Sequence, residues 1–148
     1  MRVDFYLLRP EVAGGLGPNS VLDTDVHPPR VHRMHYEFAD WMGDVLLETF
    51  PVFIIERGTG EAAQAAGLTG TELAPVETSV TPEGQELMEM AGIDSLPEFA
   101  WLKIHGKPGV DDFGQLPDAG LVVSDRALSL LRDAGIDNCE VEPFHGGE

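Results

Sequence analysis

Short apolar runs separated by turn residues set the pattern of hydrophobic and polar positions along this chain. Continuous apolar runs predict buried strands, and weaker alternation predicts half-buried ones. The expected strands are residues 2–8, 31–38, 52–55, 71–77, 99–104, 121–123 and 139–142. Residues 43–49 fit a strand or a helix equally well.

Three helices are expected between these strands, at residues 58–66, 82–91 and 125–134. Thr81 and Ser124 precede the second and third helices, where a hydroxyl can cap the free N–H groups of the first turn. A glycine follows each of the three helices, which is the usual residue where a helix ends and the chain reverses. Residues 10–29, rich in Gly, Pro and Asp, predict a long loop that is mobile or functional.

An internal repeat relates residues 52–76 to residues 120–144 by a shift of 68 positions. Phe53-Ile54-Ile55 falls on Leu121-Val122-Val123, and Ala66-Gly67-Leu68 falls on Ala134-Gly135-Ile136. Each copy predicts a buried strand, a helix that covers it, a glycine stop and a second strand. The sequence therefore predicts a single domain, residues 1–148, of the α/β (α+β) class with a mixed β-sheet built on two strand–helix–strand repeats.

The net charge of the chain limits the classes of molecule that it can bind. The 148 residues include 26 acidic and nine basic side chains, so the net charge is −17. Phosphate backbones and anionic membranes repel such a surface, whereas a basic protein is attracted to it. With a single cysteine, Cys139, no intrachain disulfide can form, and the apolar run at the N-terminus is too short for a secretory leader. We therefore expect a cytoplasmic protein that binds neither nucleic acid nor membrane.

Motifs for catalysis or cofactor binding are weak in this sequence. His27, His32 and His35 are close enough in sequence to raise the hypothesis of a metal site. Side chains alternate along a strand, so His32 and His35 point to opposite faces, and loop or surface histidines are the favoured interpretation. No phosphate-binding glycine loop and no nucleophile motif is complete, so no cofactor and no enzymatic activity are expected.

Three segments together resemble a known group of proteins. They are the run from Gly43 through Phe50-Pro51 to Ile55, the run from Leu96-Pro97-Glu98 to Gly106-Lys107, and the Leu-Val-Val-Ser-Asp-Arg-Ala-Leu segment that begins at Leu121. Over about residues 43–144, the pattern resembles a family of immunity proteins from bacterial polymorphic toxin systems, first described from a myxobacterial protein. The resemblance implies an inhibitor that binds a toxin domain made by the same cell.

A surface around the loop after residue 103 is the expected contact with such a basic partner. Aromatic side chains ringed by acids supply binding energy at many interfaces. The candidate partner-binding residues are Glu98, Trp101, Asp111, Asp112, Phe113 and Asp118. Alternation along the strand allows Trp101 to be an ordinary, partly buried strand residue instead.

Two other functions remain open. The first is a small enzyme that uses carboxylates or the His27–His35 segment, which a deep pocket with convergent titratable groups would favour. The second is a scaffold or regulatory subunit, which a large apolar patch in a symmetric contact would favour.

Overall fold

The computed structural model describes residues 4–145 and has the α+β class that the sequence predicts. Its helices are α1 (Arg57–Ala65), α2 (Pro82–Met90) and α3 (Asp125–Ala134). The strands are β1 (Phe5–Arg9), β2 (Gly14–Leu16), β3 (Val21–Asp23), β4 (Arg30–Arg33), β5 (His35–Phe38), β6 (Leu46–Thr49), β7 (Val52–Glu56), β8 (Thr71–Ala74), β9 (Glu77–Val80), β10 (Phe99–Ile104), β11 (Phe113–Gln115), β12 (Leu121–Ser124) and β13 (Glu140–Pro143).

The two strand–helix–strand repeats form the centre of the fold, one in each of two four-stranded sheets. The first is β7–α1–β8 in a sheet of order β6-β7-β10-β8, and the second is β12–α3–β13 in a sheet of order β11-β12-β1-β13. In both sheets the two repeat strands are separated by one antiparallel strand. That central strand is β10 in the first sheet and β1, from the opposite end of the chain, in the second. All pairs in these two sheets are antiparallel.

Equivalent strands in the two sheets also pair with their central strand in the same register. Glu72 of β8 lies opposite Lys103 of β10, and Glu140, 68 positions after Glu72, lies opposite Arg9 of β1. Each pair forms an ion pair, at 3.8 Å between Lys103 Nζ and Glu72 Oε1 and at 3.9 Å between Arg9 Nε and Glu140 Oε2. The repeat in the sequence therefore corresponds to a repeat in the tertiary structure, down to the cross-strand contacts.

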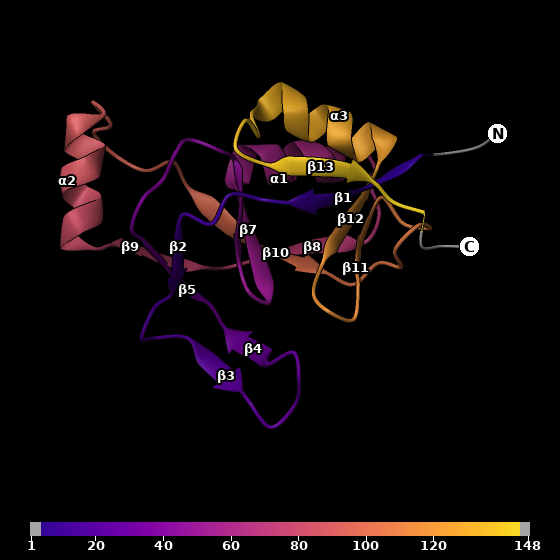
Figure 1. The fold of residues 1–148 in the computed structure, drawn as a ribbon, viewed down its shortest axis with the longest axis horizontal. Coiled ribbons are helices and arrows are strands. Elements are labelled where there is room, and N and C mark those ends of the chain that lie inside the picture. The colour runs from indigo at the N-terminus through magenta and orange to yellow at the C-terminus, as the bar shows by residue number, and fades with distance from the viewer. Residues whose placement is uncertain (1–3, 146–148) are drawn as a thin grey trace.

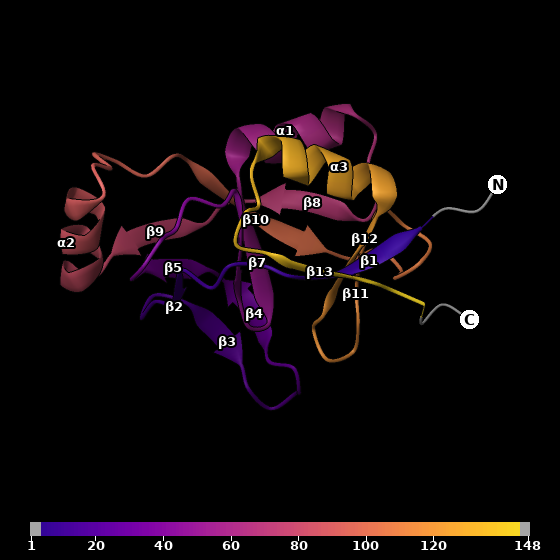
Figure 2. The ribbon, with the colours of Figure 1, turned by 45° about the horizontal axis from the view of Figure 1, so that its top comes forward.

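Helices α1 and α3 pack side by side over one face of these sheets, as both views show (Figures 1 and 2). The N-terminal caps occupy equivalent positions, 68 residues apart. The Glu56 carboxylate accepts from the N–H groups of Gly58 and Thr59, and the Ser124 hydroxyl accepts from the N–H of Ala127. Caps of this kind fix where a helix begins, because they satisfy N–H groups that have no partner inside the helix.

Two hydrophobic cores lie on opposite faces of the sheet that holds β7 and β10. Phe53, Ile55 and Leu102 face the helices, whereas Ile54 and Trp101 face the other way. The second core is completed by a three-stranded sheet of order β2-β5-β9. Because strands β7 and β10 are covered on both faces, they are apolar almost continuously, and the sequence predicts both as buried strands.

Several elements differ from the expectation. The single mixed sheet is replaced by two antiparallel sheets, a small mixed sheet and the β3–β4 pair. The expected loop at residues 10–29 contains β2 and β3 and buries Glu11 and Ala13. Residues 43–49, which the sequence left open, supply strand β6.

The expected strand at 31–38 is divided into β4 and β5, and β11 is a strand that the sequence did not predict. The periodicity at these places was too short to distinguish a strand from a turn, and pairing with a distant strand decided the outcome.

Helix α2 stands apart from α1 and α3, at the far left of both views (Figures 1 and 2). Only Gly84 and Met88 of its nine residues are buried. Gly84 lies against the backbone of Phe38 and Ala39, where an added Cβ would approach a carbonyl oxygen to within 3.0 Å. No helix among residues 4–145 is long and apolar enough to cross a membrane.

Candidate functional site

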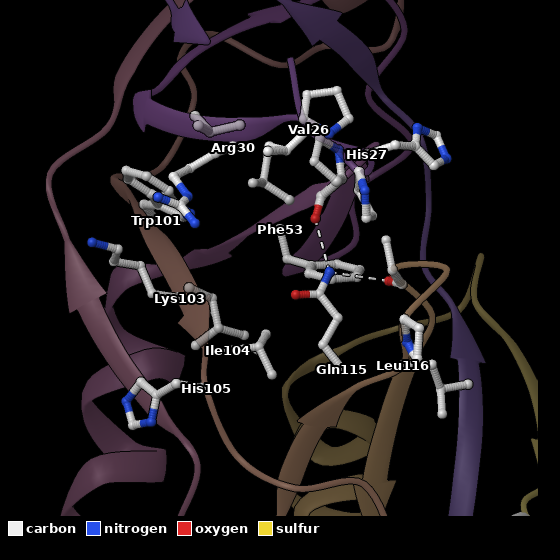
Figure 3. Close-up of a pocket in the computed structure, with 18 of the residues that line it drawn as sticks. Val26, His27, Arg30, Phe53, Trp101, Lys103, Ile104, His105, Gln115 and Leu116 are labelled. Carbon is white, nitrogen blue, oxygen red and sulfur yellow. Dashed lines mark hydrogen bonds between the residues drawn. The ribbon is translucent and has the colours of Figure 1, made fainter. Parts of the chain in front are cut away.

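A pocket of about 720 Å³ opens where β7 begins and β10 ends (Figure 3). Its walls come from segments far apart in the sequence: the loop before β4, the start of β7, the end of β10 and the turn between β11 and β12. Phe53 and Trp101 contribute aromatic rings, and Leu116 and Ile104 add aliphatic surface. The volume is in the range of pockets that hold small organic ligands.

The charged side chains that line this pocket are basic. These are Arg30 and Lys103; the imidazoles of His27 and His105 also contribute to the wall, and no Asp or Glu is among the lining residues. Lys103 Nζ lies 4.7 Å from the centroid of the Trp101 ring, in a cation–π contact, and 3.8 Å from Glu72 Oε1 at the exposed edge.

The Gln115 side chain has a defined orientation in the pocket. Its Nε2 donates to the carbonyl oxygens of Pro51 (2.8 Å) and Ala119 (3.2 Å). These bonds fix which end of the amide carries the nitrogen, and Figure 3 shows the amide oxygen directed towards the interior of the pocket. The pocket therefore presents one hydrogen-bond acceptor among its cationic and apolar groups.

A second feature is the acidic segment, defined here as residues 82–98, which includes α2. It contains Glu83, Glu86, Glu89, Asp94 and Glu98 and no basic residue. Most of its residues are exposed.

Two large apolar side chains also face solvent on α2: Leu87 is 44% exposed and Met90 is 84% exposed. At a spacing of three they share one face of the helix, and Glu83, Glu86 and Glu89 lie beside them in sequence.

The predicted partner-binding residues differ in burial and in their contacts within the protein. Glu98 and Asp118 are exposed, and Glu98 pairs with Arg57 at 3.7 Å. Asp111 is half-buried and accepts from the N–H of Lys107 at 2.7 Å. Trp101 belongs to the second core and lines the pocket, so the ordinary strand interpretation of this residue holds.

Asp112 and Phe113 are buried in this structure. Phe113 is fully buried in the core beneath α1 and α3. Asp112 is 7% exposed, and each of its carboxylate oxygens is bonded within the protein. Arg126 donates to both oxygens at 2.8 and 2.6 Å, and Ser124 and the Thr69 N–H donate at 2.6 and 2.9 Å.

These partners, the guanidinium of Arg126 first, hold the pKa of Asp112 well below its usual range. Asp112 is therefore a structural carboxylate that joins the two repeats.

The three histidines singled out in the sequence have three different surroundings. His27 lines the pocket, and His32 is exposed on β4. His35 is buried: its Nδ1 accepts from the N–H of Asn19, so Nε2 carries the hydrogen of the neutral ring and donates to Ser79 Oγ at 2.7 Å. Within residues 4–145, no three His, Cys, Asp or Glu side chains are grouped as a metal site requires.

Cys139 is partly buried, and burial raises the pKa of its thiol to about 11. A thiol with such a pKa is almost entirely protonated at neutral pH, so Cys139 is a poor nucleophile.

Sequence patterns alone did not predict the pocket or the exposed apolar pair on α2. The pocket combines residues from four separate segments, and of its lining residues the sequence had indicated only His27 and Trp101, each for a different role. The apolar pair on α2 was detectable as Leu87 and Met90 in an otherwise polar helix, but without the fold these positions resemble a core-facing stripe.

The fold and its surface features define an acidic α+β protein with a duplicated strand–helix–strand unit, a cationic pocket and a protruding acidic helix. No protein-family model and no curated protein matches this sequence.

Proposed function

We propose that this protein is a non-enzymatic inhibitor of the immunity type, which neutralises a basic bacterial toxin domain by binding to it. The observation that carries the proposal is the acidic segment, residues 82–98, with Leu87 and Met90 exposed among its carboxylates. The resemblance of residues 43–144 to toxin immunity proteins supports the same function.

This surface combines the two contributions that tight, fast protein association requires. Exposed apolar side chains surrounded by polar groups are typical centres of binding energy. The surrounding carboxylates complement a positively charged partner and accelerate its encounter. A partner can dock on the exposed face of α2, because only Gly84 and Met88 of its nine residues are buried.

The proposal is tested by co-expressing the protein with toxin domains encoded in its native genome. The expected result is rescue of growth by the wild type for one toxin domain, and isolation of a stoichiometric complex. The double variant E86K/E89K, which reverses two charges on α2, should weaken that complex by at least about 100-fold, because close charge pairs at interfaces couple strongly.

The matched control is E61K/D133K. Glu61 and Asp133 are also exposed on helices, and the control changes the net charge by the same amount. It should retain binding and rescue. Equal loss in both double variants would show that only total charge matters and would contradict a docking role for the acidic segment. Rescue by no toxin domain would overturn the proposed function.

A further inference from the structure

We infer that the pocket between β7, β10 and the β11–β12 turn is a binding site for a small organic anion with an apolar, planar body. This inference goes beyond the proposed inhibitor function and is independent of it, since none of residues 82–98 lines the pocket.

The first support is the charge of the lining against the charge of the whole chain. Nineteen residues line the pocket. With the average composition of this chain, such a set would hold about three carboxylates and one basic residue. It holds no carboxylate, two of the nine basic residues and two of the five histidines. In a protein of net charge −17, the pocket is therefore a local site where a negative ligand is favoured.

The second support is that the positive charges are available. Within residues 4–145, Arg30 has no carboxylate within ion-pair distance, and its residue is exposed at the start of β4. Lys103 has one such neighbour, Glu72, at 3.8 Å, and the two side chains are 42% and 63% exposed. An exposed ion pair of this length is weak, so a ligand anion can replace Glu72 as the partner of Lys103.

The third support is the apolar part of the pocket wall. Val26, Ile104 and Leu116 provide an accessible apolar surface near the cations, and the pocket holds about 720 Å³. An inorganic anion would leave most of this surface in contact with water, whereas an aromatic or similarly apolar body would cover it. The Gln115 amide oxygen adds an acceptor for a hydroxyl or N–H on the ligand.

Together these groups specify the chemical class of the ligand. Its anionic group, a phosphate or a carboxylate, lies between Arg30 and Lys103, and its apolar body lies against Ile104 and Leu116. Arg30 is suited to this role because a guanidinium binds such groups with two parallel hydrogen bonds.

The test uses the full-length protein and 1-naphthyl phosphate as the probe, with binding followed by calorimetry and by NMR shifts of backbone amides. The expected result is saturable binding of one probe molecule per chain, with the shifts centred on residues 101–106 and 115–119. Inorganic phosphate and the uncharged 1-naphthol should each bind at least about tenfold more weakly, because each lacks one of the two contributions.

Two variants and two matched controls locate the site. K103Q and R30Q should each weaken probe binding about tenfold or more, since each removes a charge-assisted hydrogen bond. K107Q and R33Q remove the same charges at neighbouring exposed positions that do not line the pocket, and they should leave the affinity unchanged. E72Q removes the competing carboxylate and should strengthen binding.

Three results would overturn the inference: equal affinity for 1-naphthylmethylamine and 1-naphthyl phosphate, equal loss of affinity in the variants and their controls, or binding of inorganic phosphate as tight as that of the probe. The α2 variant E86K/E89K serves to separate the two proposals. It should bind the probe like the wild type, even if no toxin partner is found.

Discussion

At the scale of single residues, Asp112 connects its own loop with two other parts of the chain. Its carboxylate bonds to the Thr69 N–H after α1, to the Ser124 hydroxyl and to the guanidinium of Arg126 at the start of α3. A buried carboxylate with all its partners in place stabilises the fold, whereas its loss leaves several donors without an acceptor.

Replacement of Asp112 by Asn should lower the free energy of unfolding by about 2–3 kcal/mol at pH 7. The asparagine side chain brings an NH₂ group towards donors that need an acceptor. The loss of stability is no larger than this because the Arg126 side chain is 60% exposed and can be hydrated by solvent. Urea unfolding of D112N and of the exposed control D133N provides the comparison. The free energy of unfolding of D133N should differ from that of the wild type by less than about 0.5 kcal/mol, as is usual for surface substitutions.

The stabilisation by Asp112 should decrease at acidic pH. Because the pKa of Asp112 is lowered in the folded protein, the unfolded chain binds this proton more readily. The stabilisation by Asp112 is complete above the usual carboxyl pKa of about 4 and is lost as the pH falls below it. The difference between wild type and D112N should therefore shrink between pH 7 and pH 3. A difference that stays constant over this range would contradict the assigned role of the charged carboxylate.

At the scale of elements, the N-terminal caps of α3 and α2 differ in how much of the folded structure they stabilise. The Ser124 hydroxyl is buried and both accepts from the Ala127 N–H and donates to Asp112. The Thr81 hydroxyl accepts from the Gly84 N–H alone, on a helix that has few buried residues. The same cap chemistry therefore supports the centre of the fold in α3 and only a local element in α2.

Ser124→Ala should cost about 2–3 kcal/mol of global stability, because it removes a cap and one of the bonds to Asp112. Thr81→Ala should cost about 1 kcal/mol or less and act locally. Hydrogen exchange distinguishes the two. S124A should accelerate exchange in the central strands β1 and β12, whereas T81A should accelerate it only in α2. Equal acceleration throughout the protein in T81A would show that α2 unfolds together with the cores.

At the scale of the whole molecule, a net charge of −17 acts on stability as well as on binding. The cross-strand pairs Glu72–Lys103 and Glu140–Arg9 use two of the nine basic residues, and nine basic side chains cannot neutralise 26 carboxylates. Repulsion among them opposes the compact state, and salt screens it over about 8–10 Å at physiological ionic strength.

The melting temperature should therefore rise when NaCl is increased from 10 to 150 mM. The variant E86K/E89K, in which the net charge moves from −17 to −13, should show a smaller rise because less repulsion remains to be screened. Thermal unfolding followed by circular dichroism measures both. A melting temperature that falls with added salt would mean that attractive ion pairs dominate the surface energy.

The sequence by itself determined the α+β class, the approximate positions of the three helices and the two strand–helix–strand units 68 residues apart. Those features depend on local periodicity, caps and glycine stops, which can be identified within a window of ten to twenty residues.

Only the tertiary structure decided which strand fills the centre of each sheet, that Asp112 and Phe113 are buried, and that Arg30, Lys103 and Gln115 meet around one pocket. These outcomes depend on pairing between segments far apart along the chain. No local pattern specifies such pairing, because the same short apolar strand can pack on one face or on two.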